Sequence, residues 1–329
     1  MIGYYAHHQG SGHVQRLRAI AAHLRTPVTG LSSLPQPEDW HGQWVQLSRD
    51  DDPFPAPGTD VDANGRMHWA PTAHEGYSAR MATISAWTAT ARPTLMVIDV
   101  SVEVTVLART LGVPVVVAAM RGDRSDPAHV LAYDLAHSLL APWPGTLPEP
   151  QWPDRWITKT VHTGAFSRFD ETAGSKTEPI PGSVVCLLGS GGSDLPPDFA
   201  DTVSAATPQW RWTFCGGDFG PSREPLADLL ASAEVVVTHA GQNAVAEVAA
   251  LRRPAVVVAQ ARPHQEQLAT VRALRHADLA VPCDRWPADD AWPDLLCEAR
   301  DLGGTGWDRW NDHHGGQRAA AALDELATR

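Results

Sequence analysis

The chain has 329 residues, 43% of them hydrophobic and 19% charged, with a formal net charge of -12 at pH 7. A chain of this length exceeds what one hydrophobic core usually supports, so two domains with a cleft between them are expected. The acidic balance and the lack of Lys/Arg runs argue against nucleic acid or an anionic surface as a partner. No apolar stretch approaches the roughly 20 residues of a membrane span and no signal-peptide pattern opens the chain, so we expect a cytoplasmic protein.

The first half of the chain alternates strand and helix patterns. Residues 1–5 are apolar and predict a strand, and after a glycine-rich turn apolar residues recur at helical spacing over 14–24. Further along, the pattern predicts a strand over 95–100, a helix over 102–111 that ends at a glycine, and a strand over 113–118.

Between these elements, residues 34–71 are rich in Pro, Asp, Trp and Gly and carry three consecutive acidic residues at 50–52. A connection of that length with so little periodicity is usually a functional lid or a mobile loop. A surface insertion that the fold merely tolerates explains the segment equally well.

The second half repeats the alternation. The sequence predicts strands over 184–188, 210–214, 235–238 and 255–259, separated by helices over about 196–206, 224–233 and 243–251. Alternation of this kind implies parallel sheets with helices on both faces. The polar stretch at about 165–182 is the expected linker between two such domains.

Cysteine and histidine spacing gives no sign of a metal centre. The four cysteines form no CxxC pair, have no histidine at zinc-finger spacing and are expected to be reduced core residues. HExxH is also absent. The sequence therefore predicts no metal and no other cofactor.

The turn after the first strand reads Gly10-Ser-Gly-His13. Its glycines let the backbone approach a ligand, and the helix N-terminus behind Gly10 and Gly12 favours negative charge. The turn is not a GxGxxG, because Gln15 occupies the third glycine position, and the chain contains no GxxxxGK[ST]. A tight turn alone explains the glycines about as well as a ligand does.

His13 is the candidate general base, because ligands of parallel sheets bind at the mouth of the sheet and histidine titrates near neutral pH. A helix-capping or solvent-exposed histidine is the alternative. Asp99, which ends the next predicted strand, could orient His13 or bind an acceptor, or it could cap the helix that follows.

A more specific segment, Thr238-His-Ala-Gly-Gln-Asn-Ala-Val-Ala-Glu247, follows the strand over 235–238. Gly241 and the first amides of the next helix could cradle a diphosphate, and His239 and Asn243 add donors. Glu247 could accept two hydroxyls of a ribose. Its place eight residues after His239 predicts that it lies about two helical turns further along, on nearly the same face. The alternative is a surface glutamate behind a capping histidine.

A third segment, Arg262-Pro-His-Gln-Glu-Gln267, follows the last predicted strand. There Glu266 and Gln267 could bond the hydroxyls of a sugar, although a polar helix start would look the same.

His239-x-Gly241-x-Asn243-x-x-x-Glu247 followed by Glu266-Gln267 resembles the donor-binding signature of GT-B glycosyltransferases. The chain looks most similar to the family 28 branch that contains the bacterial undecaprenyl-diphospho-muramoylpentapeptide transferase and its actinobacterial relatives. The turn at 10–13 is similar to that branch's acceptor-side loop, the run at 189–193 to its phosphate loop, and the segment 163–168 to its domain junction.

The resemblance implies a GT-B fold, in which two Rossmann-like domains with parallel sheets face each other across a cleft. It implies an N-terminal acceptor domain over 1–165, a C-terminal nucleotide-sugar domain over 183–310 and a C-terminal helix over 311–329 that could pack back on the first domain. It also assigns diphosphate contacts to a set that comprises Ser190, Gly191, Gly192, His239, Gly241, Asn243 and Arg168. It further implies that Glu247 binds the ribose and that Glu266 and Gln267 bind the donor sugar. His13 would act as the general base.

Several positions depart from the family pattern. Ala244 replaces the small hydroxyl residue that often follows the signature asparagine, and Glu266 stands where many relatives carry Asp. No basic, apolar patch of the kind expected in a lipid-linked transferase is evident, so a soluble small-molecule or natural-product acceptor is favoured over a lipid carrier.

The expected reaction is transfer of a sugar from a nucleoside-diphosphate donor, of the UDP-GlcNAc or UDP-glucose type, with inversion and without a metal ion. The expected assembly is a monomer or homodimer. Two alternatives remain: a GT-B-fold epimerase or hydrolase acting on the nucleotide-sugar itself, and a non-catalytic nucleotide-sugar-binding subunit. A nicotinamide dehydrogenase and a serine hydrolase are disfavoured, because neither the dinucleotide fingerprint nor a GxSxG occurs.

Overall fold

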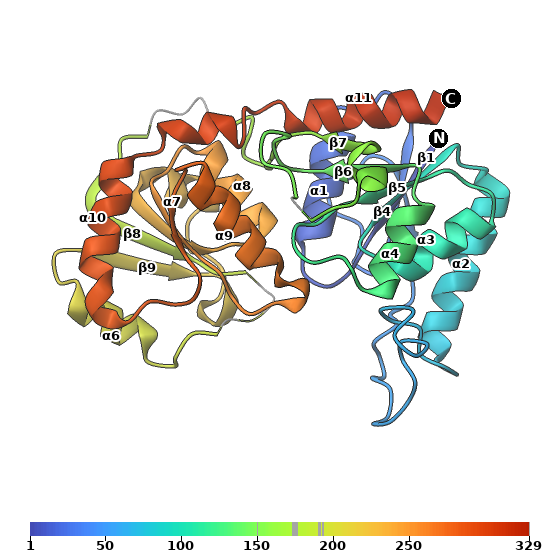
Figure 1. Cartoon of the computed structure of the whole chain (residues 1–329), viewed down its shortest axis with the longest axis horizontal. Helices are drawn as coiled ribbons and strands as arrows, with labels where there is room; N and C mark the ends of the chain where they lie inside the picture. Colours follow the sequence, from blue (N-terminus) through green and yellow to red (C-terminus); the bar gives the residue numbers. More distant parts are fainter. Residues whose placement is uncertain (150, 173–176, 190–191, 193, 329) are drawn as a thin grey trace.

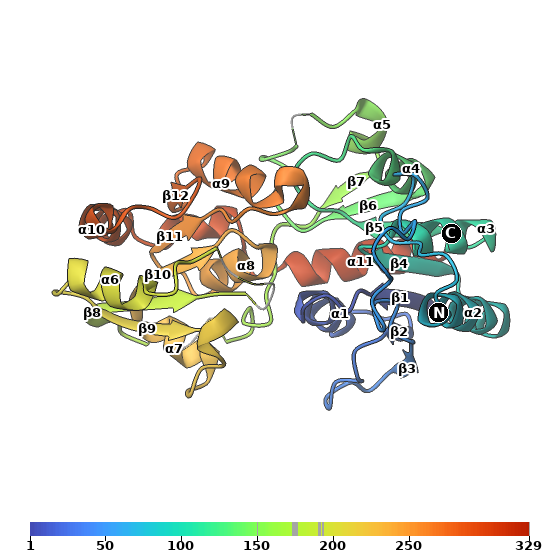
Figure 2. The ribbon, with the colours of Figure 1, turned by 90° about the horizontal axis from the view of Figure 1, so that it is seen from below.

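The computed structural model describes residues 1–149, 151–172, 177–189, 192 and 194–328. Within these residues the chain forms two α/β domains, each built on one parallel sheet (Figures 1 and 2). This confirms the predicted fold class. Among the described helices, none is long and apolar enough to cross a membrane.

The N-terminal domain has a seven-stranded sheet in the order β3-β2-β1-β4-β5-β6-β7. Its strands are β1 (Ile2–Ala6), β2 (Val28–Ser32), β3 (Gln43–Gln46), β4 (Leu95–Asp99), β5 (Val115–Ala118), β6 (Ser138–Ala141) and β7 (Thr160–His162). Its helices are α1 (Gly12–Ala21), α2 (Glu75–Ala91), α3 (Val102–Thr110), α4 (Pro127–Leu135) and the single turn α5 (Asp154–Ile157).

The C-terminal domain has a five-stranded sheet in the order β12-β11-β10-β8-β9. Its strands are β8 (Ile180–Leu187), β9 (Arg211–Cys215), β10 (Ala233–His239), β11 (Ala255–Val258) and β12 (Val281–Cys283). Its helices are α6 (Phe199–Ala206), α7 (Leu226–Ser232), α8 (Gln242–Ala250), α9 (Glu266–His276) and α10 (Trp292–Leu302), and the chain ends in α11 (Gly315–Thr328).

The central strands explain why the sheets are parallel and covered on both faces. All five residues of β4 are buried, and in β10 the run Val235–Thr238 is completely buried. Strands that are apolar on both faces need helices above and below them, and α/β crossovers supply these helices.

Strand order reverses at one point in each sheet, and these points position the polar loops. In the first sheet β1 lies between β2 and β4, and Ala6 pairs with Asp99 at the carboxyl end. In the second sheet β10 pairs with β8, with Thr238 beside Leu187. Ligands of open α/β sheets bind in the crevice at such a reversal, so each domain presents one binding edge.

The segment 34–71 is less loose than its composition suggests. It contains the edge strand β3, and Asp50 is buried. Arg80 of α2 bonds the Asp50 carboxylate at 2.5 Å and the Ser48 carbonyl at 3.0 Å. The start of the acidic run is therefore tied to the domain rather than mobile.

Helix α11 returns from the C-terminal domain to the N-terminal one (Figure 1). Its Ala319, Ala320 and Leu323 are buried in one cluster with Ile2 and Leu17. The last helix of the chain therefore completes the core of the first domain.

Candidate active site

His13 lies at the reversal point of the first sheet, in the first turn of α1. Its Nδ1 lies 2.8 Å from Oδ1 of Asp99, the last residue of the neighbouring strand β4. Because an ionised carboxylate can only accept, the pair places the proton on Nδ1 and leaves Nε2 as the basic nitrogen. Ser101, not Asp99, caps α3 through a bond from Val104 N, so the capping alternative for Asp99 is wrong.

Two further groups donate to the fully buried Asp99 carboxylate. Arg16 donates to Oδ1 at 2.6 Å and the Tyr4 hydroxyl donates to Oδ2 at 3.2 Å. Burial by itself would raise the pKa of Asp99, but the charge of Arg16 and the contact with His13 bring that pKa below its usual range. Asp99 is therefore an anion at neutral pH and can stabilise a protonated His13.

At the reversal point of the second sheet, His239 ends β10 and Gly241 precedes α8. The Gly241 amide donates to Nδ1 of His239 at 3.1 Å, so Nδ1 carries no proton and Nε2 is the N–H of the ring. Burial, with Arg262 nearby, lowers the pKa of His239 to about 4. The ring is therefore a neutral hydrogen-bond donor at pH 7.

His239 packs against the loop that follows β8. A methyl group built on Gly189 would lie 2.6 Å from Nε2 of His239, so only glycine leaves room for the ring there. Of the predicted phosphate loop, Gly192 is exposed, whereas Ser190 and Gly191 lie outside the described residues. Nε2 of His239 therefore points at the loop where a phosphate is expected.

Glu247 lies on α8, which begins only at Gln242. The prediction that one helix carries both His239 and Glu247 is wrong, because His239 belongs to the strand. The two residues still line the same cleft. The Glu247 carboxylate accepts a 2.9 Å bond from Nε of Arg168, while burial raises its pKa and Arg168 opposes that rise.

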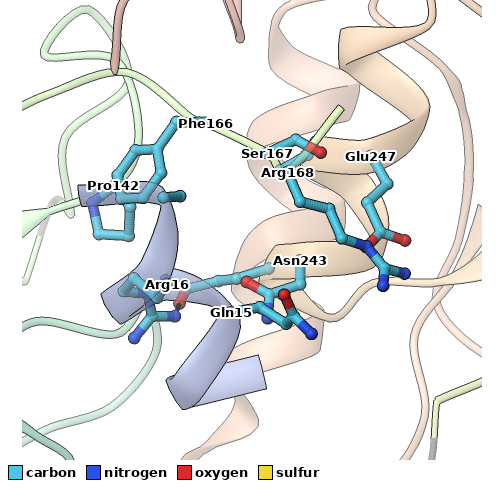
Figure 3. A pocket seen from close by; sticks show the side chains of 11 residues that line it. Gln15, Arg16, Pro142, Phe166, Ser167, Arg168, Asn243 and Glu247 are labelled. Carbon is cyan, nitrogen blue, oxygen red and sulfur yellow. Dashed lines mark hydrogen bonds and ion pairs between the residues drawn. The ribbon is translucent and has the colours of Figure 1, made fainter. Parts of the chain in front are cut away.

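Arg168, which the resemblance assigns to the diphosphate, lines the cleft and contacts Glu247. Figure 3 shows the two side chains together, with Asn243 also from α8 and with Gln15 and Arg16 from α1. The arginine comes from the segment that connects the two domains. It therefore fixes the carboxylate on the C-terminal side of the cleft.

Glu266 and Gln267 begin α9. Oε1 of Gln267 accepts bonds from the amides of Ala240 at 3.2 Å and Gln260 at 3.0 Å, and the side chain is buried. Glu266 is partly exposed and lies 3.6 Å from Arg124 of the other domain. Gln267 therefore holds the loop after β10 in place. The Glu266 carboxylate instead lies near the surface between the two domains.

The residues from both domains surround one cleft of about 630 Å³. The N-terminal side contributes Gly10, Gly12 and His13, and the C-terminal side contributes Gly189, Gly216, His239, Gly241, Asn243 and Glu247. Gly12 lies directly against Asn243, because a methyl group built on it would be 2.4 Å from Nδ2 of that side chain. The predicted base and the predicted diphosphate cradle therefore face each other.

Arg16 is a site residue that the sequence analysis missed. Its guanidinium bonds Asp99 in its own domain and Oε1 of Gln242, in the other domain, at 2.6 Å. It lies three residues after His13, which places it about one helical turn further on the same helix. That spacing is the one signal in the sequence that could have pointed to it.

Residues 221–281 match the family model described as the glycosyltransferase family 28 C-terminal domain. The matched segment begins in the loop after β9 and ends in β12, so it contains Glu247, His239 and the start of α9. The chain has the GT-B fold, and its residues 221–281 resemble the C-terminal domain of family 28 glycosyltransferases. No curated protein sequence matches it.

Solved structures of glycosyltransferases resemble this chain over almost its whole length. CalG4, the calicheamicin glycosyltransferase, is 17% identical, with 100% of this chain and 98% of that chain covered and a TM-score of 0.65. MurG of Acinetobacter baumannii is 17% identical, with 98% and 99% covered and a TM-score of 0.58. A UDP-glucosyltransferase from Polygonum tinctorium is 14% identical, with 100% and 98% covered and a TM-score of 0.66.

Proposed function

We propose that this transferase moves a sugar, with inversion, from a nucleoside-diphosphate donor to a hydroxyl of a soluble small-molecule acceptor. One observation carries the proposal: His13, which the buried Asp99 contacts from behind, lines the same cleft as His239 and Asn243 of the other domain. A base on one side and a neutral donor array on the other are what a single displacement needs.

The reaction balances with these residues alone. Nε2 of His13 takes the acceptor proton as the acceptor oxygen attacks the anomeric carbon. The bond from that carbon to the diphosphate oxygen breaks, and the nucleoside diphosphate leaves with the electron pair. Asp99 stabilises the imidazolium that forms, in the way a buried carboxylate serves other catalytic histidines.

The leaving charge develops at the start of α8. In this proposal the Nε2–H of His239, the amides at the start of the helix and the Asn243 side chain bond the phosphate oxygens. Such donors replace a divalent cation at the diphosphate, so we propose a metal-independent transfer. Glu247 is assigned to the ribose and Glu266 to the transferred sugar.

The proposed donor and acceptor are inferred from the solved structures that this chain resembles. A UDP-linked hexose, of the UDP-glucose or UDP-GlcNAc type, is proposed as the donor because a UDP-glucosyltransferase is among the similar structures. That enzyme is described as glucosylating indoxyl, and CalG4 as a calicheamicin transferase. A small natural-product-like acceptor is therefore proposed.

The test has two parts, both in the presence of EDTA. A thermal-shift screen with nucleoside diphosphates and nucleotide-sugars identifies the donor, because a ligand that binds the folded state raises its melting temperature. The chain is then incubated with that donor, with and without a panel of phenolic and alcoholic acceptors. Products are identified by mass spectrometry, and their anomeric configuration by NMR.

We expect a glycosylated acceptor of inverted anomeric configuration and a donor that stays largely intact without acceptor. Conversion of the donor alone would identify an epimerase or hydrolase. Donor binding without any conversion would identify a binding subunit. Turnover that is lost in EDTA and restored by added magnesium or manganese would refute the metal-independent step.

A further inference from the structure

Outside the cleft, three histidines and one aspartate meet where the two domains touch. His68 comes from the long loop after β3, Asp126 and His129 from the start of α4, and His264 from the loop before α9 of the other domain. The four possible ligand atoms lie within 4.8 Å of one another. The proposed transfer uses none of these residues.

Two histidine nitrogens each lie about one edge of a metal tetrahedron from an oxygen of Asp126, one from Oδ1 and the other from Oδ2. Nε2 of His68 lies 3.3 Å from Oδ1 of Asp126, and Nδ1 of His264 lies 3.5 Å from Oδ2 of the same carboxylate. Two ligand atoms on one tetrahedral Zn²⁺ lie about 3.4 Å apart, because Zn–N and Zn–O bonds are each about 2.1 Å long. Two imidazoles and one carboxylate are also a ligand set that borderline divalent metals favour.

His129 has a different place in the cluster. Its Nδ1 lies only 2.5 Å from Oδ2 of Asp126, which is a hydrogen bond and too short for two ligands of one metal. Arg124 donates to Nε2 of His129 at 3.1 Å, so the imidazole proton must be on Nδ1 and points at the carboxylate. His129 therefore orients Asp126 from behind, as outer partners of metal ligands do.

The backbone that presents His264 is strained and clamped. His264 and Gln265 are consecutive non-glycine residues in the left-handed region, with φ of 60° and 55°. The amide of Asp123, in the other domain, donates to the His264 carbonyl at 2.8 Å. A methyl group on Gly122 would lie 2.3 Å from that carbonyl oxygen. Such strain persists only where its surroundings impose it, and it clusters at functional positions.

We infer that His68, Asp126 and His264 form a binding site for one Zn²⁺-class divalent cation that links the two domains. His68 and Asp126 supply ligands from the N-terminal domain and His264 supplies one from the C-terminal domain. The fourth position is open to water. His129 is a positioning residue, and a bound cation holds the loop before α9 against α4.

This site departs from the sequence-based prediction of no metal, because its three ligands come from positions separated by 58 residues or more in the chain. It does not contradict metal-independent transfer, since none of the three lines the cleft. The cation site stands on its own geometry and is tested without a donor.

The test is calorimetric titration of ZnCl₂ into the metal-stripped full chain, with MgCl₂ as the hard-cation comparison. We expect one Zn²⁺ per chain and no comparable binding of Mg²⁺, because imidazole suits Zn²⁺ far better. His68→Ala and His264→Ala should each weaken binding by about 100-fold or more, since even outer partners are worth 10- to 100-fold. His314→Ala removes an exposed histidine elsewhere and should leave the affinity unchanged.

Asp126→Asn is the decisive conservative variant. Asp126 also caps α4 by accepting from the His129 amide at 3.1 Å, and asparagine caps equally well but has no charge. Folding should survive and Zn²⁺ affinity should fall. Zn²⁺ should raise the melting temperature of the wild type and of His314→Ala only. No stoichiometric binding by the wild type, or affinity unaltered in both His68→Ala and His264→Ala, would overturn the proposal.

Discussion

The Asp99 carboxylate is hydrogen-bonded to three side chains of the N-terminal domain. Its buried carboxylate accepts from Tyr4, His13 and Arg16, and Arg16 continues to Gln242 of the other domain. A buried charge is stable only when it is paired and fully hydrogen-bonded. The arrangement therefore keeps an anion behind His13. It also links the orientation of that histidine to the contact between the two domains through Arg16 and Gln242.

His13→Ala tests the base directly. We expect turnover to fall by on the order of 10² or more, the usual contribution of a positioned general base. Affinity for the nucleoside diphosphate should change little, because the proposed diphosphate cradle lies in the other domain. Steady-state kinetics and calorimetry on one preparation measure both quantities.

Tyr4→Phe is the matched control, since it removes one donor to Asp99 without touching His13. It should retain most of the turnover. If His13→Ala itself remains near native, the base is another residue and Asp99 is the next to test.

Glu247 offers a sharper residue-scale experiment. If its carboxylate accepts both ribose hydroxyls, Glu247→Ala should lower donor affinity by roughly 1.5–3 kcal/mol, the range for hydrogen bonds to a charged group. That is about one to two decades in Kd. The loss should be small for a 2′,3′-dideoxy nucleoside diphosphate, which lacks both hydroxyls. Titration of both ligands into both proteins closes a cycle whose coupling term isolates the contact.

Arg168→Ala is the control for this cycle, because Arg168 bonds the same carboxylate from the linker side. It should reduce affinity for the two ligands by similar factors. Equal losses for Glu247→Ala would show instead that Glu247 serves the ion pair alone.

At the scale of elements, the loop after β9 shapes one wall of the cleft. Gly216 has φ of 77°, and a methyl group on it would lie 2.0 Å from the carbonyl oxygen of Leu188. Gly220 in the same loop has φ of 75°, but a methyl group there would meet nothing within 4 Å. The two glycines therefore share a backbone conformation and differ in what surrounds them.

This pair predicts different outcomes for the same substitution. Both Gly→Ala variants should lose roughly 1–3 kcal/mol of stability from backbone strain. Only Gly216→Ala should also weaken nucleoside-diphosphate binding, because the loop must move away from Leu188 and distort the cleft. Urea unfolding and calorimetry measure the two effects. Equal affinities for the two variants would show that this wall does not contact the donor.

Elements with a clear apolar signal could be predicted from the sequence, and others could not. The strand 235–238 and the helix that follows appear as β10 and α8 because their buried residues give an unbroken pattern. Helix α2 was missed, because its Ala, Thr and Ser residues form no apolar stripe. Strand β2 was missed as well: it contains Gly30, which the Trp44 ring requires, since a methyl group there would lie 2.4 Å from that ring.

Some residues of the candidate site could likewise be predicted from the sequence, and others could not. His13, His239 and Glu247 could be proposed because each belongs to a recognisable local pattern at or just after the end of a strand. Gln242 as the partner of Arg16, and His264 as the partner of Asp126, could not, because these contacts join residues more than 130 positions apart. Such contacts depend on how the two domains meet, which local periodicity does not encode.

At the scale of the whole molecule, α11 fastens the end of the chain to the first domain. Asp324 of α11 accepts from the backbone amides of Arg25 at 3.1 Å and Thr26 at 2.9 Å, just before β2. Burial opposes its ionisation, but these hydrogen bonds lower the pKa of Asp324 to about 2. The carboxylate is therefore ionised in the folded state at a pH where the unfolded chain already binds the proton.

This linkage predicts a pH-dependent contribution to stability. Because the folded pKa lies below the unfolded value of about 3.9, the contribution is complete above pH 4–5 and is lost as pH falls toward 2. Asp324→Asn should lower the free energy of unfolding at pH 7 by about 1 kcal/mol or more, and the difference from wild type should shrink below pH 4. Urea titrations between pH 7 and pH 2.5 measure this difference.

Arg25→Ala is the control and should change the free energy of unfolding little, since the Arg25 side chain is 86% exposed and such pairs contribute about 0–1 kcal/mol. A difference for Asp324→Asn that stays constant with pH would mean that the charge of the carboxylate does not contribute to holding α11.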